Sequence, residues 1–218
     1  RHQVAWRNEL AGRLGRLAVQ VESDVAVPVE VASDKQEYAA RTLRNKHMAQ
    51  WDRYLQPLPA IPLRRDCLAR RWDGLDVSDP DAVLASMNVD RSVGRTSHYR
   101  GGSRQARKLL NQFLLEKLAD YATRRSDPSL GIESHMSPYL HFGQISPLEI
   151  ALAVRDCKKA PRAARDAYLE ELLIRRELAF NFVTYCHDYE RYSALPAWAR
   201  ATLKQHRRDK RPTVYTKA

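Results

Sequence analysis

The chain has 218 residues, of which 44% are hydrophobic and 29% are charged, proportions that indicate a folded globular protein rather than a disordered one. Lys and Arg (37) exceed Asp and Glu (26) by 11, an excess typical of proteins with a polyanionic partner, although a basic protein without such a partner has the same composition. No apolar run approaches the roughly 18 residues that span a bilayer, and residues 1–15 are amphipathic and charged, which argues against a membrane protein and a secretory signal.

The three cysteines are far apart in the sequence and form no C-x-x-C pair: Cys67, Cys157 and Cys186. No His or Cys lies at metal-ligand spacing from them, so we predict neither a disulfide framework nor a metal site, and a reducing cytoplasm fits best. The chain begins at Arg1 without a Met, and we interpret it as an internal fragment of a longer protein.

The N-terminal third mixes helical and strand-like patterns. Residues 1–16 have apolar residues at helical spacing, at Val4, Leu10 and Leu14. Residues 17–33 contain short valine-rich runs interrupted by polar residues and by Pro28, a pattern that predicts two short β-strands. Helix followed by strand suggests the edge of an α/β unit.

The next segment ends this unit. Residues 35–55 again have near-helical spacing, and the PLPAIP stretch that follows carries three prolines, so it is expected to be extended. We therefore assign residues 1–56 to one domain and residues 57–78 to a linker.

Every strong pattern in residues 79–218 is helical. Ser103 follows two glycines and is a candidate N-cap for a helix. The apolar face of that helix consists of Ala106, Leu109, Leu110, Phe113, Leu114, Leu118 and Tyr121.

Two further helix starts are marked by proline. Ser146 and Glu149 form a capping-box pattern with Pro147 at the first helical position, and this helix is expected to run toward Lys158. Pro161 is expected to open a third helix that continues through EELLIRRELAFNF.

The segment YATRRSDPSLGIESHMSPYLHFGQISPLEI, residues 121–150, carries the strongest signal. Its Arg-x-Asp-Pro loop at residues 125–128 and its Ser-x-x-Ser-Pro-Tyr-Leu-His-Phe-Gly run at residues 134–143 resemble the flavin-phosphate-binding segment of the photolyase and cryptochrome family. This resemblance implies an FAD site formed by Tyr121, Ser134, His135, Met136, Ser137 and Pro138.

The local chemistry agrees with a phosphate site. Ser137 before Pro138 is a plausible helix N-cap, and a helix N-terminus offers free N–H groups and a partial positive charge to a diphosphate. In the alternative interpretation, Ser134 and Ser137 only cap a helix.

A second block, residues 168–216, resembles the class II branch of cyclobutane pyrimidine dimer photolyases. The resemblance places Glu171 at the active-site glutamate, which hydrogen-bonds the pyrimidine dimer. Arg175 would contact DNA at a position where some relatives carry a dimer-stacking Trp, so this sequence departs from them in how it grips the lesion. Without the resemblance, Glu171 and Arg175 form an ordinary i, i+4 pair on a solvated helix face.

By the same resemblance, Arg125 is the arginine that enters the DNA gap left when the lesion flips out. The alternative is a salt bridge between Arg125 and Asp127 within the loop. The basic tracts at residues 158–165 and 204–211 are candidates for phosphate contacts, although a charge run is more often a solvated face.

Residues 27–47 and 89–106 also resemble class II photolyases, so the likeness covers nearly the whole chain. It implies a mostly α fold: the remnant of an α/β, Rossmann-like antenna domain at residues 1–56, the linker at residues 57–78, and the first part of the helical FAD- and DNA-binding domain at residues 79–218.

The implied activity is light-driven repair of pyrimidine dimers in DNA by electron transfer from excited reduced FAD. The expected protein is a cytoplasmic monomer without a metal, associated with the nucleoid when bound to DNA, and the chain alone is not expected to be active. Two alternatives remain open, a cryptochrome-like flavin photoreceptor and a non-enzymatic, basic, helical DNA-binding module.

Overall fold

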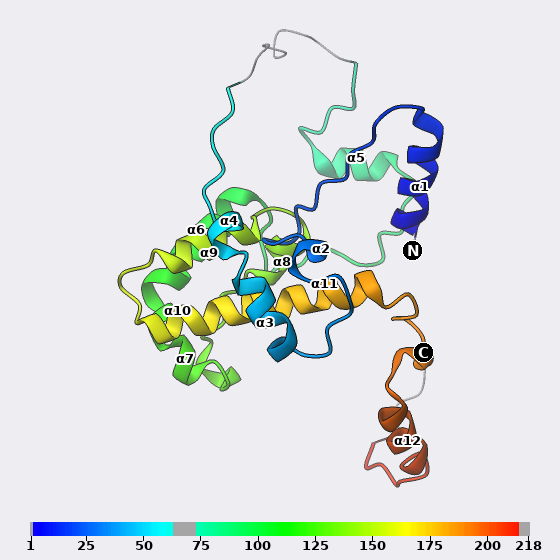
Figure 1. Ribbon diagram of the computed structural model, residues 1–218. Coiled ribbons are helices and arrows are strands. Elements are labelled where there is room, and N and C mark those ends of the chain that lie inside the picture. Colours follow the sequence, from blue (N-terminus) through cyan, green and yellow to red (C-terminus); the bar gives the residue numbers. More distant parts are fainter. Residues whose placement is uncertain (1, 63–72, 214–218) are drawn as a thin grey trace.

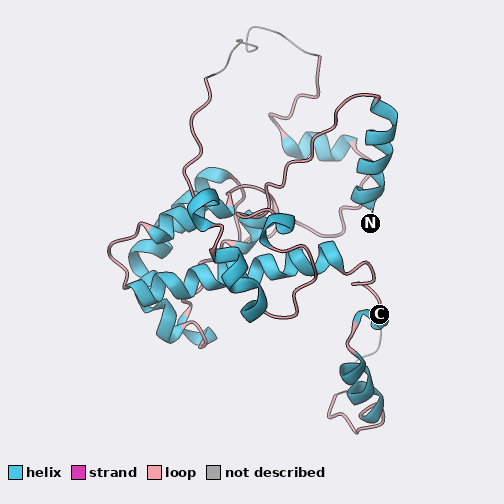
Figure 2. Cartoon of the chain, in the orientation of Figure 1, coloured by secondary structure: helices cyan, strands magenta, loops and turns pink. Residues whose placement is uncertain are grey.

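The computed structural model of the chain describes residues 2–62 and 73–213, and within these residues every regular element is a helix (Figure 2). The α-helices are α1 (His2–Leu14), α2 (Val29–Ala32), α3 (Ala40–Met48), α4 (Trp51–Tyr54), α5 (Pro80–Ser86), α6 (Ser103–Glu116), α7 (Tyr121–Arg124), α8 (Ser137–His141), α9 (Pro147–Arg155), α10 (Arg162–Leu169), α11 (Arg176–Tyr185) and α12 (Ala197–Gln205). The expectation of a mostly α fold is confirmed.

The longest element is a continuous rod made of α10, a π-helical turn at Glu170–Arg175, and α11 (Figure 1). Pro161 immediately precedes α10, so the predicted helix start is confirmed. The π-helical turn inserts one extra residue into the rod, a rare feature that occurs frequently at functional sites.

The main core lies between this rod and helices α6, α8 and α9. Phe113, Tyr139, Ile150 and Leu173 are almost completely buried there. Burial of such large apolar side chains stabilises the fold by roughly 2 to 3 kcal/mol each relative to exposure. This core fixes the position of the rod face on which the candidate site is built.

Two predicted helix starts in this core differ in detail. Ser146 caps α9, because its hydroxyl accepts a hydrogen bond from the N–H of Leu148 at 3.1 Å. Glu149 does not complete the capping box, since its carboxylate accepts two hydrogen bonds from Arg107 instead. The prediction that Ser103 is an N-cap is wrong, because Ser103 is already helical and Gly102, with φ 107°, holds the cap position.

The predicted strands in residues 17–33 are also wrong, since the structure contains only the short helix α2 there. A strand needs a neighbouring backbone to take its hydrogen bonds. Here carboxylates take them: the N–H groups of Ala26 and Val27 donate to Glu177, at 2.7 and 3.3 Å, and the N–H of Val29 donates to Glu22 at 3.0 Å.

Helices α3 and α4 divide the predicted helical region 35–55, and α3 lies across the rod (Figure 1). A buried chain of hydrogen bonds fastens them to α11. Trp51 Nε1 donates to His47 Nδ1 at 2.9 Å, and His47 Nε2 lies 2.8 Å from the carboxylate of Glu177. Because an indole N–H can only donate, His47 carries its proton on Nε2 and donates it to Glu177.

Helices α1, α5 and α12 lie away from this body (Figure 1). Helix α1 occurs as predicted, but its apolar residues Val4 and Leu10 are exposed. Of the predicted linker, residues 57–62 and 73–78 contain no helix, and the rest, with Cys67, lies outside the described residues.

Two absences hold for the described residues. None of their helices combines the length and the apolar character that a bilayer crossing requires. No group of three or more His, Cys, Asp or Glu side chains in residues 2–62 and 73–213 is placed to hold a metal ion.

Candidate active site

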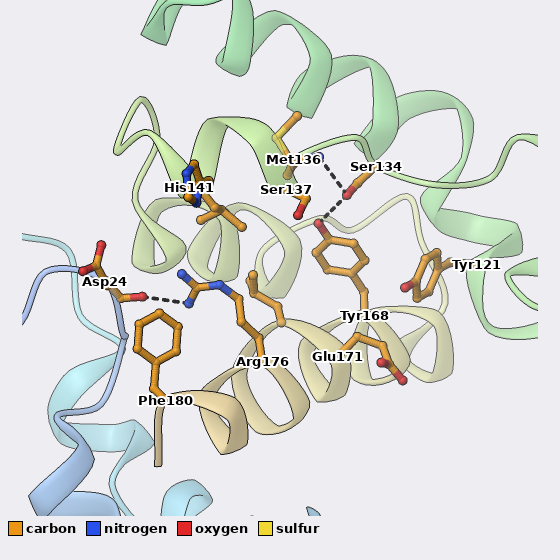
Figure 3. Close-up of a pocket in the computed structure, with 12 residues that line it drawn as sticks. Asp24, Tyr121, Ser134, Met136, Ser137, His141, Tyr168, Glu171, Arg176 and Phe180 are labelled. Carbon is orange, nitrogen blue, oxygen red and sulfur yellow. Dashed lines mark hydrogen bonds between the residues drawn. The ribbon is translucent and has the colours of Figure 1, made fainter. Parts of the chain in front are cut away.

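A cavity of about 630 Å³ lies against the rod, between the π-helical turn and the start of α8 (Figure 3). Its volume is in the range of cofactor pockets. Five residues that the sequence analysis selected line it: Tyr121, Ser134, Met136, Ser137 and Glu171. The other lining residues are Asp24, Leu140, His141, Tyr168, Leu172, Arg176 and Phe180.

The loop before α8 is shaped by Ser134 rather than by Ser137. The Ser134 hydroxyl accepts hydrogen bonds from the Tyr168 hydroxyl at 2.9 Å and from the N–H of Met136 at 3.4 Å. His135 between them has φ 56°, a left-handed conformation that is uncommon outside glycine. This conformation turns the chain into α8.

The prediction that Ser137 is an N-cap is therefore wrong. Ser137 is the first residue of α8, and Met136 holds the cap position without a side-chain cap bond. Because α8 has only five residues, its dipole is small, and the Ser137 hydroxyl is left as a polar group on the wall of the cavity.

Aromatic rings form one end of the site. Tyr168 contacts Phe113 and Tyr121, with ring centroids 4.8 and 5.1 Å apart. Burial raises the pKa of Tyr168 to about 12 and also raises the pKa of Tyr121. Both phenols are therefore protonated at neutral pH, and Tyr168 remains the donor to Ser134.

Glu171 lies at the centre of an ion-pair cluster. The Arg125 guanidinium donates to its carboxylate, and Arg175 Nε lies 3.2 Å from the same oxygen. The hydrogen bond to Glu171 raises the pKa of Arg125. Arg125 does not pair with Asp127, whose carboxylate accepts hydrogen bonds from Ser129. The structure thus contains the i, i+4 pair of Glu171 and Arg175 that the sequence analysis had considered, and it adds Arg125 to that pair.

A second pocket of about 290 Å³ adjoins the first and shares Tyr121, Ser134, Met136 and Ser137 with it. The predicted residues Arg125, His135 and Pro138 line only this smaller pocket, together with Tyr99 and Glu133. Arg175 lines neither pocket.

Arg176 is the most informative residue that the sequence analysis did not select. Its guanidinium donates to the carbonyl oxygen of Asp24 at 2.7 Å and lies over the ring of Phe180, 4.8 Å from the centroid (Figure 3). Burial lowers the pKa of Arg176, yet an arginine remains charged at neutral pH. A sequence pattern could have identified Arg176, because it lies four residues after Leu172 and four before Phe180. Residues at this spacing share one face of a helix, and here that face lines the cavity.

Several known proteins are similar to this chain in sequence. No protein-family model matches the chain. Curated relatives named deoxyribodipyrimidine photo-lyase match nearly all of it: 41% identity over 98% of the chain for the protein of Methanothermobacter thermautotrophicus, 33% over 99% for that of Potorous tridactylus, and 37% over 91% for that of Oryza sativa.

These similarities support the photolyase family. The chain spans less than half the length of these photolyases, 46%, 40% and 40% respectively. A cryptochrome of Arabidopsis thaliana also matches, with 31% identity over 46% of the chain. The photolyase similarity is the broader one, because it covers 98% and 99% of the chain in the first two relatives.

Proposed function

We propose that this chain supplies the flavin-phosphate and lesion-recognition elements of an enzyme that uses light to split pyrimidine dimers in DNA. One observation carries the proposal: Glu171 on the rod and the Tyr121, Ser134 and Ser137 segment line the same cavity, although up to 50 positions separate them. The photolyase relatives, matched over nearly the whole chain, support the same reaction.

The residues of the cavity fit FAD. Ser134 and Ser137 offer hydroxyl groups, and Arg176 brings a partly buried guanidinium to the same wall, a combination suited to a diphosphate. Tyr121, Tyr168 and Phe180 offer aromatic surface to planar rings. When bound, reduced FAD would supply the electron that opens the dimer.

The chain's own residues would hold the substrate. The carboxyl group of Glu171 would bind the polar edge of a flipped pyrimidine dimer, and the apolar side chains around it would exclude water. Arg125 would occupy the gap that the flipped lesion leaves in the duplex. Arg175, beside Glu171 but outside both pockets, would contact the DNA backbone or stack on a base.

Four finer assignments belong to the same proposal. The ELLIRRELAFNF rod supports the class II branch. Residues 1–56 would be the end of an α/β antenna domain, residues 57–78 a linker, and residues 79–218 the start of the FAD- and DNA-binding domain. The protein would act as a monomer, and it would work in the cytoplasm, on the nucleoid when bound to DNA.

The first test is an absorbance spectrum of the purified chain after FAD is added and the unbound excess is removed. A retained flavin band with structured shoulders is expected if the cavity holds the cofactor. Failure of the protein that contains this chain to bind FAD would contradict the proposal.

The second test separates the proposal from its two alternatives. In the protein that contains this chain, Glu171→Ala is expected to impair dimer splitting, whereas a photoreceptor of the cryptochrome type would show no dimer splitting to impair. Binding of dimer-containing and intact duplexes is then compared in a competition assay, because equal affinities would indicate a general DNA-binding module.

A further inference from the structure

The π-helical turn that carries Glu171 is held from outside the site by α3. Arg44 on α3 makes a two-pronged contact with Glu170: Nε donates to one carboxylate oxygen at 2.9 Å and Nη2 to the other at 2.7 Å. We call this two-pronged contact a fork; an arginine and a carboxylate bind each other most strongly in this arrangement, through two parallel hydrogen bonds. This bond lowers the pKa of Glu170, which therefore stays ionised at neutral pH.

A second contact from α3 lies beyond the turn. His47, one helical turn after Arg44, donates to Glu177, and both of these side chains are buried. Of the two acceptors, Glu170 is the first residue of the π-helical turn and Glu177 lies two residues after its end. Helix α3 thus contacts the rod at the start of the π-helical turn and just beyond it.

This double attachment matters because a π-helical turn can relax to α-helix. The change would rotate the residues before the turn by about 100° relative to those after it, since an α-helix has 3.6 residues per turn. Glu170 and Glu177 could then no longer both reach α3. The same rotation would carry Glu171 away from Arg176 and the cavity wall.

We propose that Arg44 is a positioning residue: its fork with Glu170, together with the His47–Glu177 contact, holds the π-helical turn in the register that presents Glu171 to the cavity. The catalytic part of this inference rests on the proposed function, whereas the mechanical part does not. Arg44 itself lines neither pocket, so it acts only through the rod.

The first experiment tests the mechanical part on the 218-residue chain. Amide hydrogen exchange is measured for Arg44→Gln and for the matched control Arg107→Gln, which breaks an equally forked pair with Glu149 on other helices. Exchange within residues 170–176 is expected to become on the order of tenfold faster in Arg44→Gln only. Equal exchange in these residues in the two variants would overturn the inference, whether or not the protein repairs DNA.

The second experiment asks whether Arg44 works through Glu171. In the protein that contains this chain, with FAD added, Arg44→Gln is expected to slow the splitting of bound dimers on the order of tenfold, with little change in dimer affinity. In a Glu171→Gln background the same substitution should add nothing, because the group that it positions is already lost.

Each outcome has a separate meaning. If Arg44→Gln slows splitting as much in the Glu171→Gln background as in the unmodified protein, the positioning role is overturned. If Glu171→Gln alone leaves splitting unchanged, the proposed function of Glu171 is wrong. The hydrogen-exchange experiment still tests whether Arg44 holds the π-helical turn. Arg44→Lys, which keeps the charge without the fork, serves if Arg44→Gln does not fold, and it should recover part of the splitting rate.

Discussion

Arg125 donates a hydrogen bond to Glu171, and this contact joins the two pockets, because Arg125 lines the smaller one and Glu171 the larger one. In the proposed function, both residues touch DNA. On this proposal the pair would open when a flipped lesion binds, and the lesion would replace Arg125 as the partner of Glu171.

The first prediction concerns this exchange of partners. Arg125→Gln is expected to weaken binding of dimer-containing duplex on the order of tenfold, because a neutral side chain fills the gap less well than a charged one. Binding is measured by fluorescence anisotropy in the protein that contains this chain. Arg124→Gln is the matched control, since Arg124 is adjacent and forms an ion pair with Asp120, four residues earlier in the chain. Equal losses in the two variants would contradict the assigned role.

A second prediction concerns the loop that carries Ser134. Tyr168→Phe removes the donor to the Ser134 hydroxyl, and FAD affinity is expected to fall about fivefold, equivalent to roughly 1 kcal/mol for one hydrogen bond. Flavin retention is measured by absorbance. Tyr192→Phe is the control, because its hydroxyl bonds to Arg200 near α12 and not to the site. Unchanged retention in Tyr168→Phe would show that this bond does not shape the cofactor loop.

The third prediction tests the buried contact between α3 and α11. His47→Leu removes one of the donors to the buried carboxylate of Glu177, which keeps the N–H groups of Ala26 and Val27, and leaves the Trp51 indole N–H without its acceptor. The free energy of unfolding is therefore expected to fall by about 3 kcal/mol. Trp51→Phe removes only one neutral donor and is expected to cost about 1 kcal/mol beyond its loss of packing. Urea unfolding followed by circular dichroism gives both values. A smaller loss for His47→Leu than for Trp51→Phe would contradict this ranking.

A fourth prediction concerns acid stability. Burial raises the pKa of Glu37, but hydrogen bonds from Lys46, Thr42 and Ser33 outweigh it and lower the pKa from 4.5 to about 2. Because the folded pKa lies below the unfolded one, the stabilisation is complete above about pH 4.5 and is lost as the pH falls toward 2. We expect about 2 kcal/mol, less than the full linkage value, because Lys46 is 43% exposed and water screens its charge.

Unfolding at pH 6 and pH 3 tests this prediction with the variant Glu37→Gln. The variant should lose stability at pH 6 and show a shallower decline between the two values. Glu116→Gln, a change at an exposed position on α6, should leave the decline unchanged. A decline of the same slope in Glu37→Gln and the unmodified chain would contradict the assignment.

The sequence predicted the helices whose determinants are local. The apolar face of α6 from Ala106 to Leu114, the Ser146 cap of α9 and the proline before α10 are encoded within a few residues, so pattern reasoning found them. The predicted helix extended too far, because α6 ends at Glu116 and Leu118 and Tyr121 belong to the next two short helices. The resemblance to photolyases identified Tyr121, Ser134 and Glu171, which the fold then brought to one cavity.

The predictions that were wrong concern residues whose hydrogen-bond partners lie far away in the sequence. The valine-rich residues 17–33 have a strand pattern, but the groups that bond their N–H groups include Glu177, about 150 positions later. The sequence alone offered the nearby Asp127 as an alternative partner for Arg125. In the structure Arg125 instead donates to Glu171, 46 positions later in the chain. The bond between Arg44 and Glu170 was not predicted, because no local pattern pairs two residues that lie 126 positions apart.

The attachment of α3 to the rod also has a consequence for synthesis on the ribosome. Arg44 and Glu170 are 126 positions apart, and bacterial and eukaryotic ribosomes add roughly 5 to 20 residues per second. Helix α3 therefore emerges roughly 6 to 25 seconds before the carboxylates that will hold it. During that interval Leu43 and His47, which are buried in the finished protein, are open to chaperones and proteases. The N-terminal segment thus depends on late translation of the rod to become protected.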